Sequence, residues 1–488
     1  MKLLKSKKEY IFFLCVVIAC VFPLVVMEFS TDTYHFALVS LADGLGAGMK
    51  YNGRFITSLS AYALDAVGFG IVGYYYFSLI CAVLCLSLAI YHIYIILKGK
   101  MRGCVAAFLS FVTVFNPLTI EFFLFIEKGA FAFAILMSVL SAKSFVCFLK
   151  GDKKRIIFSY IYLTFGACTY QLLSAAFVTL ALVFIVIYSR SIKDFVINNL
   201  LAVTVYGFAN CVDFVLLKIF NPSNVRMSGE INLSNILKYY FITEREWVIF
   251  IYIALFAVVF CAFGFLGKRR FGSYFAKGSV VEFGKYFYIF TGTALAAAVP
   301  FIFVNPVEVW MMFRTTYALG VLPGAIAIKI FYKPDGVCEK ESSLFEKKKR
   351  RGSIIMLTII FVELVFFHTM IFSRLKNNFE DERLCEQIGL IIRDYEVDTG
   401  ERIKYISIYY DAKITQRNDG VLMIGDCNVR AFSRTWSDVN HMSYLLGRSF
   451  VRIENNPEYT RRFSSLDWND FSKDQLIFEG NTLHLCVY

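Results

Sequence analysis

The chain has 488 residues, of which 58% are hydrophobic and 17% aromatic, and its formal net charge is +12. Ordinary soluble domains are about 45–50% apolar, so this composition excludes a soluble globular protein. The lysines and arginines lie in short blocks between apolar runs. Their charge therefore indicates membrane orientation, and no nucleic-acid partner is expected.

The first apolar run follows a lysine-rich start, as in a secretory signal peptide. No small-residue cleavage site comes after it, and the polar stretch 28–33 follows instead. We therefore expect a retained first transmembrane helix.

Later apolar runs continue this pattern along most of the chain. A helix needs about 20 apolar residues to cross the roughly 30 Å of hydrocarbon in a bilayer. About eleven spans are predicted, and the runs at 103–120 and 156–169 are short or interrupted, so a re-entrant pair would change the number by two. The predicted spans are 10–27, 73–97, 103–120, 129–149, 156–169, 172–189, 196–219, 247–267, 284–304, 315–332 and 353–373.

Basic residues occupy alternate loops between these runs. They concentrate at 98–102, 150–155, 190–193, 268–270 and 347–351. The positive-inside rule makes these loops and the N-terminus cytoplasmic. An odd number of spans then divides the chain into a transmembrane domain, 1–373, and a soluble C-terminal domain, 374–488, on the far side of the membrane.

The C-terminal domain has the pattern of a small α/β fold. Helical spacing of apolar residues at 388–392 indicates an amphipathic helix. Strands are expected at 403–410, 475–478 and 483–488, which are rich in β-branched and aromatic residues. In an oxidising compartment one pair among Cys385, Cys427 and Cys486 could form a disulfide, and the sequence does not choose the pair.

Ionisable residues beside the membrane on the far side are the candidates for a site, because placing them there is costly. Asp32 lies about one turn beyond the first helix. It could act as a general base toward a sugar hydroxyl, or hold a cation that bridges a phosphate. The alternative is a helix-flanking or N-cap residue, aided by Ser30 and Thr31.

Further polar residues fall in loops on the same side. The planar guanidinium of Arg54 suits a phosphate, although an arginine snorkelling to the interface is an equally good interpretation. Each of the other positions alone is typical of an ordinary loop, and their common side favours a joint site for a phosphate-linked substrate. These positions are Glu121, Glu127, Lys128, Tyr170, Gln171 and Arg314.

Several short motifs together resemble the serotype-converting O-antigen glucosyltransferases of bacteria and their phages. The motifs are Asp32-Thr-Tyr34, Tyr51-Asn-Gly-Arg54, Asn116-Pro-Leu-Thr-Ile-Glu121 and Thr169-Tyr-Gln171. The length and the C-terminal domain are similar to the type II branch of that family, and the resemblance spans most of the chain.

The resemblance implies a C-type glycosyltransferase fold in the bacterial inner membrane. Such enzymes move glucose from undecaprenyl-phosphate glucose to a sugar of the lipid-linked O-antigen repeat on the periplasmic face. It implies catalytic carboxylates at Asp32 and Glu121. It also implies a donor-phosphate contact by Arg54. From their charge, Lys128 and Arg314 could likewise stabilise the anionic leaving group, and Tyr34, Tyr170 and Gln171 of the motifs are further candidate substrate contacts.

Cofactor use stays open at this point. The adjacent acidic dyad of some C-type relatives is absent, since Asp32 is followed by Thr33 and Tyr34, so a divalent cation is possible and the metal ligands are unknown. No glycine-rich Walker-type loop is found, which suits a lipid-linked donor and requires no nucleotide.

Two other functions compete with glucosyl transfer. A flippase or transporter of lipid-linked oligosaccharides predicts polar residues in the middle of the spans, where Asp213 and Glu363 are exceptions inside apolar runs. An O-antigen polymerase usually depends on a large external loop between spans rather than on a C-terminal domain.

Overall fold

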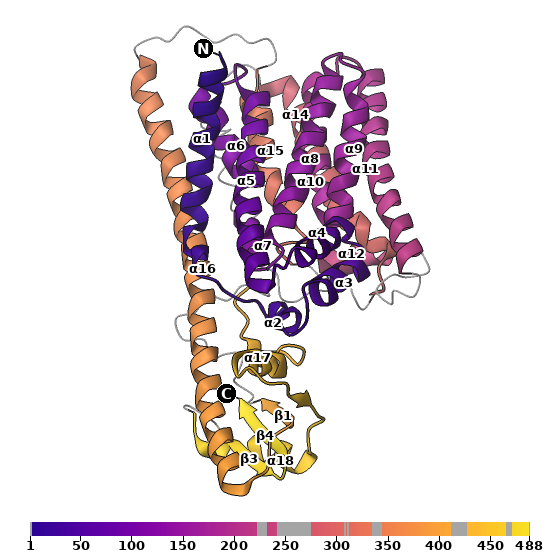
Figure 1. Cartoon of the computed structure of the whole chain (residues 1–488). Coiled ribbons are helices and arrows are strands. Elements are labelled where there is room, and N and C mark those ends of the chain that lie inside the picture. The colour runs from indigo at the N-terminus through magenta and orange to yellow at the C-terminus, as the bar shows by residue number, and fades with distance from the viewer. Residues whose placement is uncertain are drawn as a thin grey trace.

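The computed structural model describes residues 2–221, 232–241, 275–306, 309, 312–333, 344–410, 427–464 and 471–487. A bundle of long helices holds the N-terminus at one end, and a small mixed domain lies beyond the other end (Figure 1). We call that other end the distal end, and several short helices lie across it. The predicted span at 247–267 lies outside the described residues.

The bundle is built from helices that are apolar over most of their surface, as expected of segments that contact lipid on one side and protein on the other. One continuous apolar core runs through it. Its helices are α1 (Lys2–Val21), α5 (Ile71–Leu97), α6 (Gly103–Val114), α8 (Lys128–Leu149), α9 (Arg155–Thr169), α10 (Ala175–Tyr188), α11 (Ile192–Phe220), α14 (Phe275–Ala298), α15 (Tyr317–Phe331) and α16 (Leu344–Thr399).

The chain is a multi-pass α-helical membrane protein, but eleven spans are not confirmed. Within the described ranges, seven helices are long and apolar enough to cross a membrane, or eight if one bent pair is a single span. That pair bends by 41° between α6 and a 3-10 turn, where Asn116 caps Pro117. The predicted spans at 156–169 and 315–332 form α9 and α15, which are each 15 residues long.

Short helices carry the loops of the distal end. They are α2 (Thr31–Ala37), α3 (Ala47–Tyr51), α4 (Phe55–Ala66), α7 (Ile120–Phe123) and α12 (Ser234–Phe241). Gly53 turns the chain from α3 into α4 with a φ of +76°, which favours glycine. A Cβ there would also lie 2.9 Å from Nε2 of Gln171, so the tight turn lies against the 3-10 turn between α9 and α10.

Helix α16 joins the two parts of the molecule. It has 56 residues, which corresponds to about 84 Å at 1.5 Å per residue. The predicted domain boundary at 373/374 falls inside it, because the charged stretch after Ser373 continues the last span without a break. The predicted amphipathic helix near 388–392 is therefore the distal part of the same helix (Figure 1).

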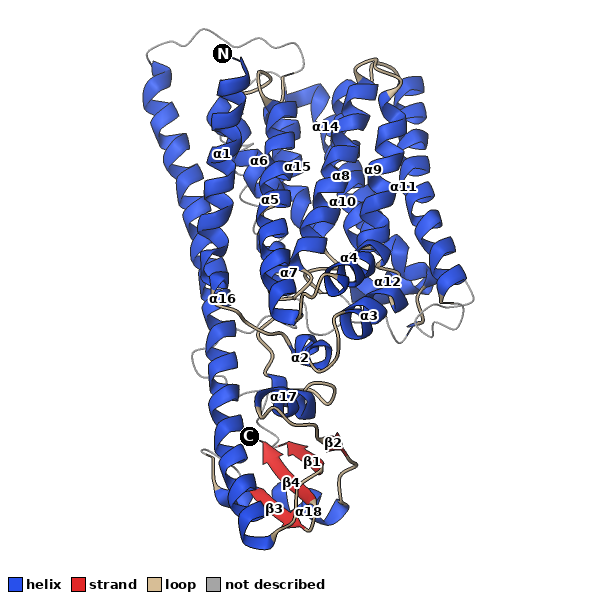
Figure 2. Ribbon diagram, viewed as in Figure 1, coloured by secondary structure: helices blue, strands red, loops and turns tan. Residues whose placement is uncertain are grey.

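The C-terminal domain contains a four-stranded sheet of order β2-β1-β4-β3. The strands are β1 (Tyr405–Tyr410), β2 (Val451–Arg452), β3 (Leu476–Glu479) and β4 (Thr482–Val487), shown red in Figure 2. The three predicted strands are confirmed, and the two-residue β2 was not predicted. β1 is parallel to β2 and β4, whereas β3 and β4 are antiparallel.

The sheet packs on the distal part of α16, whose Leu384, Ile388 and Ile392 enter a separate apolar core with the strands. Helices α17 (Asp438–Leu445) and α18 (Pro457–Ser464) complete the domain. Of these elements, α17 faces the distal end of the bundle (Figure 2).

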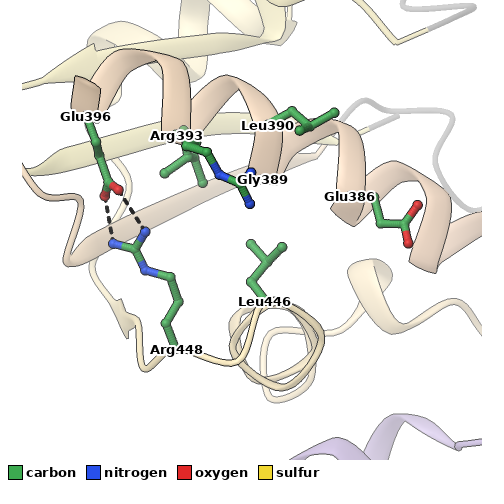
Figure 3. A pocket seen from close by; sticks show the side chains of 8 residues that line it. Glu386, Gly389, Leu390, Arg393, Glu396, Leu446 and Arg448 are labelled. Atoms are coloured by element: carbon green, nitrogen blue, oxygen red, sulfur yellow. Dashed lines mark hydrogen bonds and ion pairs between the residues drawn. The ribbon is translucent and has the colours of Figure 1, made fainter. Parts of the chain in front are cut away.

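A surface pocket of about 360 Å³ lies between α16 and the loop after α17. Gly389 permits the close approach there, because a Cβ would lie 2.5 Å from Leu446. The pair formed by Glu396 and Arg448 borders the pocket (Figure 3). None of the residues predicted to form the site lines it.

Candidate functional site

Arg54 is the centre of a charged cluster at the distal end. Its Nη1 donates to Oε1 of Glu127 at 3.1 Å, and its guanidinium lies 4.6 Å from the ring centroid of Tyr170. Arg54 precedes α4, Glu127 caps α8, and Tyr170 ends α9. Three segments far apart in sequence therefore meet at one guanidinium that remains 18% exposed.

A second arginine joins this cluster. The backbone N–H of Arg314 donates to Oε2 of Glu121 at 2.5 Å, and the two side chains form an ion pair. Glu121 is buried on α7, while the Arg314 side chain is 14% exposed. Both predicted residues are thus brought together, with Glu121 held as the counter-ion of Arg314.

The charges of Arg54 and Arg314 both act on Tyr170 and Glu127. Burial raises the pKa of Tyr170, and the charges of Arg54 and Arg314 both oppose that rise. Burial likewise raises the pKa of Glu127, where Arg54 opposes the shift and the charge of Asp32 adds to it. We call Arg54, Glu121, Glu127, Tyr170 and Arg314 the distal cluster.

Lys128 is buried behind the distal cluster. Its Nζ lies 3.5 Å from Oε1 of Glu28 and 3.6 Å from the ring centroid of Tyr75. Nε of Arg374 lies 3.6 Å from the other Glu28 oxygen. Desolvation is the largest effect on Glu28, and it raises the pKa of this carboxyl. The position of Lys128 makes it a structural counter-ion rather than a group open to substrate.

Asp32 lies in the first turn of α2, at the seam between the bundle and the C-terminal domain. The indole Nε1–H of Trp436 donates to its Oδ1 at 3.0 Å. Ser30 precedes α2, but its side chain makes no cap hydrogen bond. Asp32 sits inside the first turn of the helix rather than at its N-cap.

One face of α16 fixes this seam. Arg374, Asn377, Asn378 and Asp381 follow the i, i+3, i+4, i+7 spacing of a single helical stripe. Asn378 exchanges two hydrogen bonds with the backbone of Phe29, at 2.8 and 3.0 Å.

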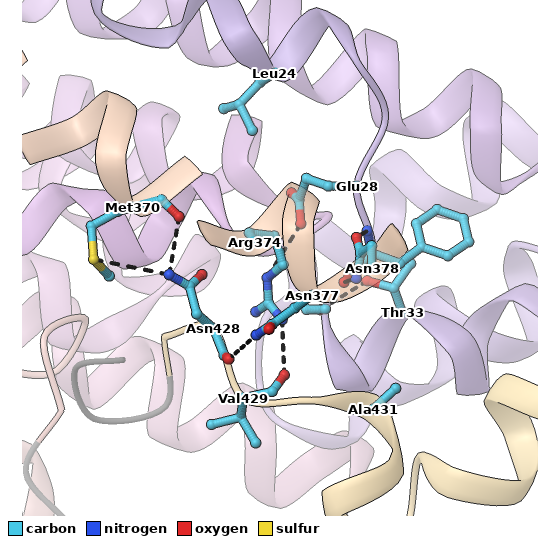
Figure 4. Close-up of polar contacts among 12 residues, drawn as sticks. Leu24, Glu28, Thr33, Met370, Arg374, Asn377, Asn378, Asn428, Val429 and Ala431 are labelled. Carbon is cyan, nitrogen blue, oxygen red and sulfur yellow. Dashed lines mark hydrogen bonds and ion pairs between the residues drawn. The ribbon is translucent and has the colours of Figure 1, made fainter. Parts of the chain in front are cut away.

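The same stripe of α16 also forms hydrogen bonds with the segment that leads into α17. Arg374 donates to the carbonyl of Val429 at 3.0 Å, and Asn377 donates to the carbonyl of Asn428 (Figure 4). Asp381 accepts from Arg430 Nε at 2.7 Å and from the Ala431 N–H at 2.9 Å. The entry to α2 and the entry to α17 are therefore both fixed to one helix.

Tyr34 is buried in the seam rather than open to a substrate. Its ring makes edge contacts with Phe29, His441 and Tyr444, and burial raises its pKa. Burial also lowers the pKa of His441 to about 4. The apolar contacts of Tyr34 attach α2 to α17.

Gln171 lies at the rim of the distal cluster. Its Nε2 donates to the carbonyl of Asn52 at 3.4 Å, next to the Gly53 turn. It therefore supports the turn that carries Arg54. Of the residues predicted to form the site, Arg54, Glu121, Tyr170 and Arg314 converge, Asp32 lies at the seam beside them, and Tyr34, Lys128 and Gln171 have packing or supporting contacts.

Glu127 and Trp436 complete the site. Glu127 was expected in the same outward loop as Lys128, and the structure pairs it with Arg54. Trp436 is 52% exposed, and its contact with Asp32 was not predicted.

The sequence left open a divalent cation at the site and a disulfide in the C-terminal domain. Across the described part of the chain, no three His, Cys, Asp or Glu side chains converge as metal ligands. Cys385, Cys427 and Cys486 are buried, and none of the three is joined to another by a disulfide.

No protein-family model matches the chain, and searches of curated proteins and of solved structures likewise gave no match.

Proposed function

We propose that the chain is a bacterial inner-membrane glycosyltransferase that moves glucose from undecaprenyl-phosphate glucose to the lipid-linked O-antigen repeat on the periplasmic face. The observation that supports it best is the pair of partly exposed arginines, Arg54 and Arg314, in one cluster at the distal end, with Asp32 close enough for its charge to act on Glu127 of that cluster. The resemblance of the motifs supplies the identities of donor sugar, acceptor and membrane.

The chemistry requires a cation for the leaving group and a base for the acceptor. Asp32 would take the proton from an acceptor hydroxyl while the oxygen of that hydroxyl attacks the anomeric carbon of the donor glucose. The bond from that carbon to the phosphate oxygen breaks, and the polyprenyl phosphate leaves as an anion. Arg54 and Arg314, partly exposed in the structure, would stabilise the phosphate charge electrostatically.

Asp32 is suited to act as this base because only one of its oxygens is engaged. Trp436 holds Oδ1, and within the described residues Oδ2 has no hydrogen-bond partner. Glu121 would act through Arg314, whose guanidinium and backbone it holds. Glu121 is therefore a positioning residue in this proposal.

Transport of a lipid-linked saccharide is the second candidate function. Glu363 lies in the apolar part of α16, is buried, and has no hydrogen-bond partner for either carboxylate oxygen among the described residues. Asp213 on α11 is also buried. Ionisable residues inside spans mark ion or substrate pathways in transporters.

The mass of the O-antigen repeat separates these functions. In a host that supplies the lipid-linked sugar and a matching acceptor, we expect the chain to add one hexose per repeat. Asp32→Asn should abolish the addition, because an amide cannot accept the hydroxyl proton. Asp43→Asn, at an exposed position of the same distal segment, is the matched control and should leave it unchanged.

Glu363→Gln should also leave the hexose addition unchanged. An unmodified repeat from the wild-type chain would contradict the glycosyltransferase proposal. Loss of modification in Glu363→Gln with retention in Asp32→Asn would favour transport.

A further inference from the structure

Trp436 stands out among the aromatic residues of the C-terminal domain. It precedes α17 and is 52% exposed, although its Nε1–H is fixed to Asp32 Oδ1 at 3.0 Å. The hydrogen bond crosses the seam, since Asp32 belongs to α2 at the bundle. The ring is therefore held in one orientation while about half of the residue remains open.

Polar groups surround this ring on both sides of the seam. The guanidinium of Arg434 lies 5.4 Å from the Trp436 ring centroid. Asn440 donates to the Trp436 carbonyl at 2.8 Å, and its Nδ2 lies 3.4 Å from Nδ1 of His35. The half-exposed indole thus has a carboxylate at its N–H edge and a guanidinium over one face, and an amide and an imidazole lie next to its backbone.

This combination matches the surface of a pyranose. A sugar ring presents apolar C–H groups on its faces and hydroxyls around its edge. An indole provides a large, rigid apolar face, and a few placed polar groups fix the orientation of a ligand. The charged phosphate of a donor would instead be drawn to Arg54 and Arg314.

We propose that Trp436 is the stacking platform for the acceptor saccharide, and that its indole N–H also orients Asp32 for proton abstraction. This inference rests on the proposed transferase function. The acceptor, rather than the donor, is assigned to Trp436 because the residue belongs to the C-terminal domain, on the far side of α2 from the bundle.

Two substitutions separate the two roles of Trp436 in the purified full-length chain. Trp436→Phe keeps an aromatic face but removes the N–H, so we expect kcat to fall while KM for the acceptor stays within about twofold. Trp436→Ala removes both, so KM for the acceptor should rise about tenfold beyond that of Trp436→Phe. KM for the donor should not change in either variant.

Tyr405→Ala provides the matched control. Tyr405 is an exposed aromatic residue at the start of β1, whereas the other end of β1 contacts α17 through Tyr410 and Asp438. Its kinetic constants should equal those of the wild type. An acceptor KM for Trp436→Ala equal to that of Trp436→Phe would overturn the stacking role, even with full transfer by the wild type.

Binding gives a readout that does not depend on transfer. Delipidated O-antigen saccharide should give saturation-transfer NMR signals with the wild type and with Trp436→Phe, and much weaker ones with Trp436→Ala. If the wild type transfers no hexose but binds the saccharide in this Trp436-dependent way, the transferase proposal fails and the saccharide site stands. Equal signals in all three proteins would overturn the site.

Discussion

The Lys128–Glu28 ion pair at the distal end of the bundle differs from the Arg448–Glu396 pair in the C-terminal domain in how deeply each is buried. The side chains of Lys128 and Glu28 are 0% and 1% exposed. Those of Arg448 and Glu396 are each 20% exposed, although their geometry is better, with two hydrogen bonds at 3.0 and 2.7 Å. Water can replace a lost partner in the second pair and not in the first.

The difference in burial separates charges that are fully neutralised inside the protein from charges that can still contact a ligand. A buried pair contributes little net stability when intact, but losing one partner leaves an uncompensated charge. The two arginines of the distal cluster are intermediate between these two pairs, because each is paired with a buried glutamate and yet partly exposed. These are the cations that retain access for an anionic ligand.

Removal of Lys128 should produce the largest effect on stability. Lys128→Met leaves Glu28 buried, and such a change costs about 3–5 kcal/mol. Arg374, 3.6 Å from Glu28, should keep the loss near the lower value. We expect a clear drop in the midpoint of thermal unfolding in detergent.

The double variant Glu28→Gln/Lys128→Met serves as the control for Lys128→Met. It should recover most of the lost stability, because no buried charge remains. A single variant as stable as the wild type would show that Glu28 is already neutral or hydrated.

His441 should make the seam sensitive to acid. Burial lowers the pKa of His441 from 6.5 to about 4, so the unfolded chain binds a proton first as the pH falls. Stability is then lost between about pH 6.5 and pH 4, by about 3 kcal/mol in total for this residue. His441→Phe should abolish that part of the loss.

The comparison of wild type and His441→Phe from pH 7.5 to 4.5 isolates this residue. Glu28 and Glu127 have raised pKa values, and their protonation stabilises the fold as the pH falls, in the opposite direction. Hydrogen exchange at α17 provides the local readout. Parallel pH profiles for the two proteins would contradict a neutral, buried His441.

The Arg448–Glu396 pair should give the smallest effect. Arg448→Ala removes a partly exposed pair and a hydrogen bond to the carbonyl of Ile403, which together are worth about 1 kcal/mol. High salt should reduce the difference from the wild type in thermal unfolding. A loss as large as that of Lys128→Met would remove the distinction between the two regions.

Hydrophobic periodicity was sufficient to predict much of the fold. It gave the helical membrane class, seven of the long spans and three strands, because apolar content and β-branched residues are local properties. The number of spans was harder to predict, because one apolar run bends at Asn116-Pro117 and two others form the short helices α9 and α15. The predicted domain boundary at 373/374 lies within α16, because a helix can continue from lipid into water without a break.

The candidate site was predictable only in part. Loop position on one side of the membrane located Arg54, Glu121, Tyr170 and Arg314. It could not show that Lys128 and Tyr34 are buried, since burial depends on partners more than 90 residues away, such as Glu28 and His441. The contact between Trp436 and Asp32 likewise depends on the stripe on α16, whose polar residues gave only the pattern of a charged helix.

The most direct test is glucose transfer by the purified chain in liposomes. Labelled undecaprenyl-phosphate glucose and a lipid-linked O-antigen acceptor are supplied, and label in the acceptor is counted for the wild type, Asp32→Asn and Asp43→Asn. We predict transfer by the wild type and Asp43→Asn, and at least a hundredfold lower rate for Asp32→Asn, in the range of about 10²–10⁴ expected for loss of a general base. Equal transfer by Asp32→Asn, or none by the wild type, would contradict the proposed mechanism.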